Sequence, residues 1–140
     1  MGHQCNALIL TCMDFRIQQA IVNFAAEQGL TGSYDLLAVA GAQKAVVEVL
    51  RRSGLLKDMK LAVEAHGVME IILIGHEDCG AYGGSAKFPS PQAELDAYRR
   101  DLDAAKRIIA REFPCVSVAV LFARQSHGSS WRVGPLPDSA

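Results

Sequence analysis

The chain has 140 residues, of which 50% are hydrophobic, and it carries a formal net charge of -1. These values suit one folded domain with a full core and argue against a disordered chain. Acidic and basic residues are mixed along the chain, so no basic face indicates nucleic acid and no cationic amphipathic helix indicates a membrane surface. The apolar runs, such as residues 116–123, are too short to span a bilayer.

The hydrophobic pattern predicts strands that alternate with helices. Strands are expected at the short apolar runs 7–11, 34–40, 70–75 and 116–122. Helices are expected where apolar residues recur at helical spacing, in 15–30, 43–52, 55–66 and 92–112. The last segment, 127–140, is polar and contains glycine and proline, and we expect a loose C-terminal tail there.

This alternation predicts an α/β fold, with a single domain over residues 1–140. We expect a central, mainly parallel, four-stranded β-sheet flanked by helices, because near-continuous apolar strands are typical of sheets covered on both faces. In open α/β sheets, sites form beyond the carboxyl ends of the strands, where the strand order switches. If the first and third strands are neighbours, the residues that follow them share one crevice.

Cysteine usage bears on the compartment. The chain contains Cys5, Cys12, Cys79 and Cys115, and no basic stretch precedes the first apolar run, so we expect no signal peptide. In a chain whose core is adequate without disulfides, cysteines are more often reduced. We therefore expect a cytoplasmic protein, with Cys5 and Cys115 as free thiols that begin buried strands.

Two segments have the same design, in which an apolar run ends in chemically active residues. LILTCMDFR contains Cys12, and IILIGHEDCGAYGG contains His76 and Cys79. Two thiolates and an imidazole are good zinc ligands, and three protein ligands with a free fourth position is the arrangement of catalytic zinc sites. The spacing therefore makes these three residues candidate zinc ligands at the ends of the first and third strands.

Asp14 and Arg16 leave two alternatives open. Asp14 could supply a fourth, oxygen ligand and close the site. It could instead pair with Arg16 and leave the fourth position to water, whose pKa on zinc falls to about 7. The same residues are therefore compatible with a resting or a working zinc site.

Other polar residues near these motifs favour simpler interpretations. We expect Glu77 and Asp78 to be solvated or to accept hydrogen bonds from ligands or backbone. His66 ends a predicted helix, where a cation complements the helix dipole, and we prefer that role to metal ligation. His127 lies in the tail and is expected to be exposed, whereas Phe15, between Asp14 and Arg16, is expected to lie toward the pocket.

The motif Cys12-x-Asp14-x-Arg16, followed by Gly75-His76-x-x-Cys79-Gly80, resembles the β-class carbonic anhydrases over residues 7–81. The resemblance implies that Cys12, His76 and Cys79 bind Zn²⁺. It implies that Asp14 and Arg16 form the dyad that orients and activates a zinc-bound hydroxide. The implied activity is that of a zinc lyase that reversibly hydrates carbon dioxide to bicarbonate, in a homodimer or a multiple of dimers.

Three departures from the family pattern favour alternatives. The first strand begins within ten residues, without the family's N-terminal helical arm; residues 39–42 read VAGA instead of Arg-Asn-Ala-Gly; and Phe15 replaces a small polar residue. The first alternative is a zinc hydrolase of a related small electrophile, such as carbon disulfide or carbonyl sulfide. The second is a non-catalytic, zinc-binding regulatory domain. All three functions involve a small-molecule substrate or a zinc ion, and neither nucleic acid nor membrane.

Overall fold

A five-stranded sheet forms the centre of the computed structural model, which describes residues 2–138. The strand order is β2-β1-β3-β4-β5, with β1 to β4 parallel and β5 antiparallel to β4. The strands are β1 (Ala7–Thr11), β2 (Tyr34–Ala38), β3 (Glu70–His76), β4 (Ser117–Gln125) and β5 (Trp131–Gly134). The mainly parallel α/β architecture predicted from the sequence is confirmed.

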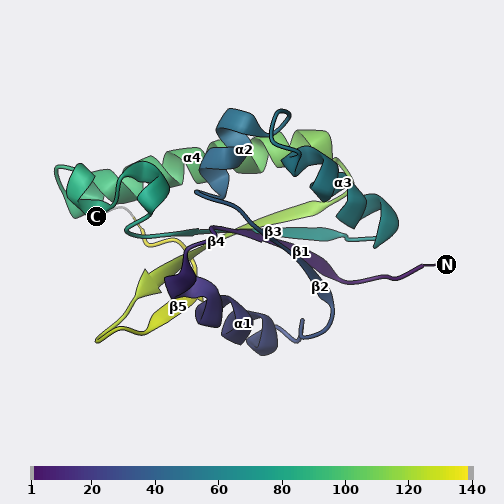
Figure 1. Cartoon of the computed structure of the whole chain (residues 1–140), viewed down its shortest axis with the longest axis horizontal. Coiled ribbons are helices and arrows are strands. Elements are labelled where there is room, and N and C mark those ends of the chain that lie inside the picture. Colours follow the sequence, from purple (N-terminus) through teal and green to yellow (C-terminus); the bar gives the residue numbers. More distant parts are fainter. Residues whose placement is uncertain (1, 139–140) are drawn as a thin grey trace.

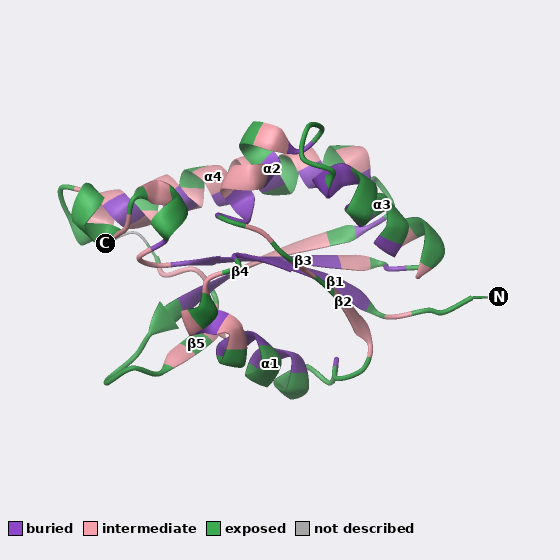
Figure 2. Cartoon of the chain, viewed as in Figure 1, coloured by how far each residue is buried: buried purple, intermediate pink, exposed green. Residues whose placement is uncertain are grey.

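Helices cover both faces of this sheet. One face carries α2, α3 and α4, and the opposite face carries α1 beside β5 (Figure 1). The helices are α1 (Gln18–Glu27), α2 (Gln43–Val49), α3 (Leu55–Ala65) and α4 (Pro91–Glu112), with 3-10 turns η1 (Phe15–Ile17), η2 (Gly80–Tyr82) and η3 (Ser85–Lys87). Because both faces are covered, every residue of β1 is buried (Figure 2).

The strand order places a topological switch between β1 and β3. From β1 the chain first builds β2 on one side and later returns to build β3 on the other. The register runs from Ala7 opposite Glu70 to Thr11 opposite Ile74, so the carboxyl ends of β1 and β3 lie side by side. The first and third strands are therefore neighbours, the condition under which the residues that follow them share one crevice, and such folds bind ligands there.

The prediction of four strands is wrong by one. β5 lies inside segment 127–140, which we predicted to be a loose tail, and it pairs with β4 from Gln125 opposite Trp131 to Phe122 opposite Gly134. A four-residue strand is too short to give a clear periodic signal, and it forms here because β4 offers an unpaired edge. Positions 139–140 of that segment lie outside the described residues.

The expected environment of one cysteine also needs correction. Cys115 is exposed rather than a buried core thiol, because it lies in the turn between α4 and β4, two residues before the strand begins. Cys5 is half-buried just before β1, and the four cysteines are free. Within residues 2–138, every helix is too short or too polar to cross a membrane.

Candidate active site

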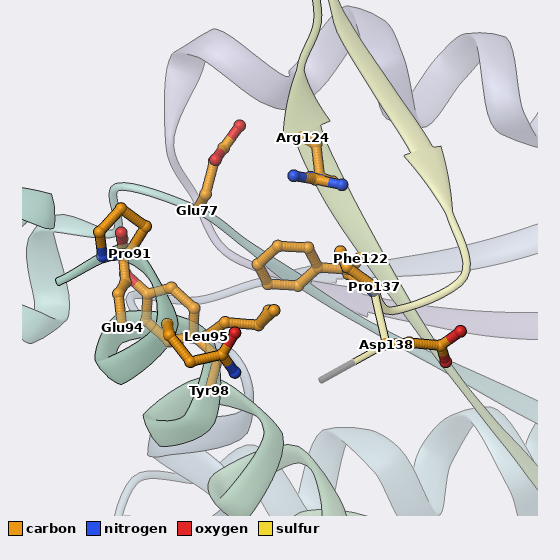
Figure 3. Close-up of a pocket in the computed structure, with 10 residues that line it drawn as sticks. Glu77, Pro91, Glu94, Leu95, Tyr98, Phe122, Arg124, Pro137 and Asp138 are labelled. Carbon is orange, nitrogen blue, oxygen red and sulfur yellow. The ribbon is translucent and has the colours of Figure 1, made fainter. Parts of the chain in front are cut away.

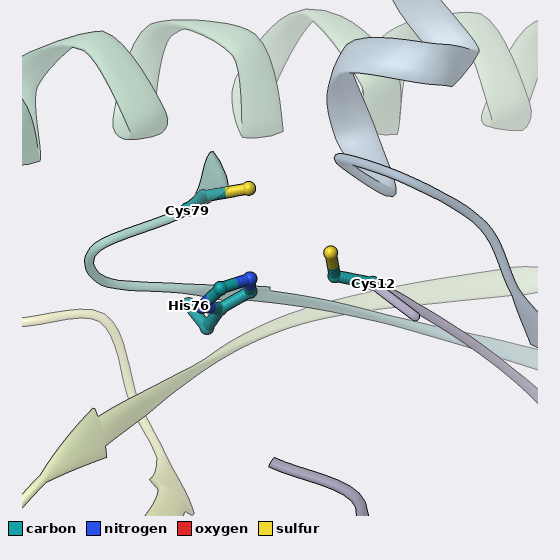
Figure 4. Close-up of side chains that lie close together, drawn as sticks. All are labelled: Cys12, His76 and Cys79. Atoms are coloured by element: carbon teal, nitrogen blue, oxygen red, sulfur yellow. The ribbon is translucent and has the colours of Figure 1, made fainter. Parts of the chain in front are cut away.

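Three buried side chains meet at the switch between β1 and β3. Cys12 directly follows β1, His76 is the last residue of β3, and Cys79 lies in the loop that follows. One ligand atom from each lies within 4.8 Å of the other two, and the sulfur and nitrogen atoms point toward one another (Figure 4). The structure therefore brings together the three residues that the spacing predicted as metal ligands.

The histidine is oriented for ligation through Nε2. His76 Nδ1 lies 2.7 Å from the Glu77 carbonyl oxygen, which can only accept, so Nδ1 carries the proton and donates. That assignment leaves a lone pair on Nε2, which is buried without a hydrogen-bond partner. A buried polar atom without a partner is costly, and a metal-ligating histidine donates its other ring N–H in this same way. The orphaned Nε2 thus fits a metal ligand.

The two thiols are electrostatically unequal. The neighbouring Cys79 thiol lowers the pKa of Cys12 to about 4, and a Gly41 N–H that donates to Cys12 Sγ over 3.4 Å adds to the effect. The pKa of Cys79 is raised, because Cys12 is its close neighbour and because it is buried. The Gly41 N–H therefore favours Cys12 as the sulfur that gives up its proton first. Divalent metal ions displace thiol protons on binding, so this donor set suits a zinc ion.

Gly41 reaches Cys12 because it has no side chain. Its φ is +78°, and a Cβ at this position would lie 3.0 Å from Cβ of Ala81. This close approach packs the loop before α2 against the loop that follows Cys79. It is the physical reason for glycine in the VAGA segment.

Asp14 and Arg16 form a close ion pair beside the cluster. Arg16 Nη2 lies 2.7 Å from Asp14 Oδ2, and the backbone N–H of Arg16 donates to Oδ1 over 2.9 Å. Arg16 holds the pKa of the Asp14 carboxyl below its usual range. Asp14 Oδ2 is also 3.9 Å from His76 Nε2, so the carboxylate faces the candidate ligands while it remains paired with Arg16. In the structure Asp14 is thus paired with Arg16, and it lies close enough to the cluster for either predicted role to stay a prediction.

Arg16 has two further contacts that the sequence did not indicate. Its Nη1 lies 2.9 Å from Asp78 Oδ2, so it links the β1 motif to the β3 motif. Its guanidinium carbon lies 5.3 Å from the centre of the Trp131 ring. The centres of the Trp131 and His76 rings lie 6.0 Å apart in a T-shaped arrangement. Trp131 belongs to β5, so the strand we did not predict closes one side of the candidate site.

A buried carboxylate anchors the loop that carries Cys79. Glu94 Oε2 accepts from the Tyr98 hydroxyl at 2.6 Å, from the Asp78 N–H at 2.8 Å and from the Ser85 hydroxyl at 2.8 Å. The Tyr98 hydroxyl oxygen in turn lies 3.2 Å from the Cys79 N–H. Glu94 is 8% exposed, an unusual burial for a carboxylate that appeared in the sequence only as one polar residue of a helix.

A cavity of about 780 Å³ opens beside the cluster. Phe15 lies at its rim and is 84% exposed, which agrees with the expectation that it faces the pocket rather than the core. The lining mixes apolar and charged side chains: Cys12, Met13, Asp14, Phe15, Arg16, Ala40, Asp78, Gly80, Ala81, Gly83 and Gly84.

A second cavity, of about 260 Å³, is lined mainly by residues of α4, β4 and positions 137–138 (Figure 3). Tyr98, Leu95 and Phe122 form its floor, and Glu77 and Arg124 stand at its edge. Its lining contains none of the three candidate metal ligands, so it is not the candidate reaction site.

His127 is exposed, as expected.

Solved structures share this fold. A carbonic anhydrase from Glaciozyma antarctica is 15% identical, with a TM-score of 0.56 over 95% of this chain and 83% of its own. The β-carbonic anhydrase CcaA is also 15% identical, with a TM-score of 0.56 over 88% of this chain and 76% of its own. At these identities the similarity establishes the fold alone.

Sequence relatives cover most of the chain. An "Uncharacterized protein" of Rickettsia bellii is 25% identical over 122 residues, which is 83% of this chain and 74% of that protein. A protein of Rickettsia conorii, also described as uncharacterized, is 25% identical over 83% of this chain and 66% of its own length. The profile of the family described as "Putative carbonic anhydrase" matches residues 2–134, and the chain therefore belongs to that family.

Proposed function

We propose that this protein is a carbonate dehydratase-type zinc lyase that reversibly hydrates carbon dioxide to bicarbonate. The observation that carries the proposal is the orphaned Nε2 of His76, which faces two thiols beside an ionised Asp14–Arg16 pair. Family membership and the β-carbonic anhydrase fold support the same reaction class.

In this proposal Cys12, His76 and Cys79 hold the zinc ion through two sulfur atoms and Nε2. When bound, zinc supplies Lewis acidity that brings the pKa of a coordinated water to about 7, so that a nucleophilic oxygen is available near neutral pH. The Glu77 carbonyl fixes the His76 ring through Nδ1, and the Gly41 N–H stabilises the negative charge on Cys12.

Asp14 orients the attacking oxygen. Its lowered pKa keeps the carboxylate ionised, so it accepts a hydrogen bond well but is a poor store for a proton at neutral pH. Arg16 fixes both carboxylate oxygens and is itself fixed by Asp78. The hydration of carbon dioxide releases one proton, and in this proposal the proton leaves to solvent through the open cavity.

The cavity suits a small, uncharged substrate and an anionic product. Met13, Phe15, Ala40 and Ala81 present apolar surface to carbon dioxide, which has no net dipole. The Arg16 guanidinium at the same cavity provides positive charge where bicarbonate forms.

The test is a paired measurement on one purified sample. Zinc content is determined by elemental analysis, and carbon dioxide hydration is followed by stopped flow between about pH 7 and pH 9. We expect the wild type to contain zinc and a variant of Cys79 to lose it. We also expect the rate of carbon dioxide hydration to rise with pH. A zinc-loaded sample without hydration at any of these pH values would contradict the proposal and would leave a zinc hydrolase of another small electrophile or a non-catalytic, zinc-binding role.

A zinc hydrolase of carbon disulfide or carbonyl sulfide is the second candidate. The observation that favours it is the exposed apolar surface at the cavity, where Met13 is 62% and Phe15 84% exposed. Such surface suits sulfur-containing substrates, which are larger and more polarizable than carbon dioxide. Release of sulfide from carbon disulfide by a sample that does not hydrate carbon dioxide would favour this candidate.

We propose that the working unit is at least a homodimer and that it acts in the cytoplasm. Leu36 is 46% exposed on β2, which is an edge strand of the sheet, and a second copy of the chain would cover it. The proposed zinc ligands must stay reduced, which suits a reducing compartment. Light scattering coupled to gel filtration gives the oligomeric state, and a monomer at micromolar concentration would contradict this part of the proposal.

A further inference from the structure

A second group of metal-ligating side chains lies at the other end of β1. Cys5 precedes the strand, Asp35 lies in β2, and His66 is the C-terminal cap of α3. One ligand atom from each lies within 4.8 Å of the other two. From this geometry we propose that Cys5, Asp35 and His66 form a second zinc site, in addition to the one in the proposed function.

The backbone holds these three residues together independently of any metal. The Cys5 N–H donates to the carbonyl oxygen of His66 over 3.0 Å, which fixes the entry to β1 against the end of α3. The Asn6 N–H donates to the carbonyl oxygen of Ser33 over 2.9 Å, which fixes the same entry against the start of β2. Figure 1 shows the N-terminal segment and the end of α3 at the same edge of the molecule. The ligand set is therefore pre-organised by the fold.

The donor types and spacing suit Zn²⁺. Thiolate, imidazole and carboxylate are its usual protein ligands, and tetrahedral ligands at normal bond lengths lie about 3.5 Å apart. His66 Nδ1 and Asp35 Oδ2 are 2.6 Å apart, so an entering ion replaces the shared proton and separates the two atoms slightly. Both side chains are about one-third exposed, at 32% and 30%, so they have room to adjust and water can take a fourth position.

A cysteine nucleophile is the main competing interpretation of a Cys–His–Asp group. A nucleophilic cysteine needs a lowered pKa. The pKa of Cys5 is instead raised, by burial and by the negative charge of Asp35. The protein therefore does not stabilise a Cys5 thiolate on its own, whereas a divalent cation would do so.

The Cys5–Asp35–His66 group lies far from the Cys12–His76–Cys79 cluster, and this distance indicates a structural role for the second site. Cys12 follows Cys5 by seven positions of extended chain, which corresponds to roughly 23 Å. One ion cannot bridge the two groups, and the second site is too distant to act on a substrate in the first. It would instead tie β1, β2 and the end of α3 together, as structural zinc sites do.

The experiment counts zinc in the full-length chain after zinc loading and removal of free metal by gel filtration. Wild type is expected to retain two zinc ions per chain. Cys5→Ser, Asp35→Asn and His66→Ala are each expected to retain one fewer, while Cys115→Ser and His127→Ala, which alter an exposed cysteine and an exposed histidine, retain the wild-type number. Zinc should also raise the thermal midpoint of a Cys79→Ser variant and not that of a Cys5→Ser/Cys79→Ser double variant.

The outcomes separate this proposal from the proposed function. Equal zinc content in wild type and Cys5→Ser would overturn the second site, whatever the activity. One zinc in wild type that is lost in Cys5→Ser and retained in Cys79→Ser would establish the second site and refute the first. If Cys79→Ser does not fold, His76→Ala replaces it in the same comparison, and cobalt loading reports thiolate ligation at each site through its charge-transfer absorption.

Discussion

The carboxylate of Asp14 is held on both oxygens by Arg16. The backbone N–H and Nε of Arg16 reach Oδ1 at 2.9 and 3.1 Å, and Nη2 reaches Oδ2 at 2.7 Å. Paired, charge-assisted hydrogen bonds of this kind are strong, and they also restrain the relative orientation of the two groups. Asp14 is thereby restrained beside the candidate metal ligands, with Oδ2 3.9 Å from His76 Nε2, as an ionised acceptor.

We predict that Asp14→Asn lowers carbon dioxide hydration by about 100- to 10,000-fold, the range lost with a positioned acid–base group, while zinc content is unchanged. The amide keeps the shape of the carboxylate but loses its charge, so it orients the attacking oxygen poorly. Stopped-flow rates and elemental analysis on the same sample provide the measurement. If zinc is lost together with activity, Asp14 acts as a metal ligand and the paired arrangement is not the working one.

We predict that Arg16→Gln destabilises the metal-free protein by about 1–3 kcal/mol near neutral pH, the usual range for hydrogen bonds to charged groups. Arg16 lowers the pKa of Asp14 in the folded state, so its stabilisation is fully present above the unfolded pKa of about 4 and is lost as pH falls through the lower, folded value. The difference between the two proteins should therefore shrink in acid. Urea unfolding at several pH values provides the measurement, and a difference that grows in acid would contradict the role given to this pair.

The sequence predicted the ligand cluster because its signals are local. Cys12 and Asp14 directly follow one apolar run, and His76 and Cys79 follow another, so the adjacency of two parallel strands was the only tertiary assumption needed. The alternation of strands and helices predicted the parallel sheet, whereas the order of its strands became known only from the structure.

The residues that support the cluster could not be predicted in the same way. Trp131 lies 55 positions after His76 in a strand of four residues, and it meets His76 and Arg16 only because β5 folds back on β4. Glu94 looks like an ordinary polar residue of a helix, and its burial depends on where the loop before α4 turns. The contacts of these two residues depend on tertiary structure, which leaves no periodic signal. The tryptophan between polar residues in SSWRVG was the one available hint of a strand.

We predict that Glu94→Ala weakens zinc binding by about 10- to 100-fold, the usual effect of losing a group that orients metal ligands. The substitution removes the acceptor of the Asp78 N–H and the Ser85 hydroxyl, so the loop that carries Cys79 loses its anchor. Zinc competition with a chromophoric chelator provides the measurement. Asp96→Ala removes an exposed acid from the same helix and should bind zinc like wild type, so equal weakening in both variants would point to a general charge effect.

We predict that Trp131→Ala lowers the free energy of unfolding by about 2 kcal/mol, because it removes the ring that packs on Arg16 and His76. Trp131→Phe keeps an aromatic face at this position and should recover most of the loss. The chain has one tryptophan, so the fluorescence of the wild type also reports on the site. Cobalt added to the metal-free protein should quench this fluorescence, and Cys12→Ser should abolish the quenching. Quenching that survives Cys12→Ser but is lost in Cys5→Ser would mean that the metal near Trp131 is not held by the cluster at the end of β1.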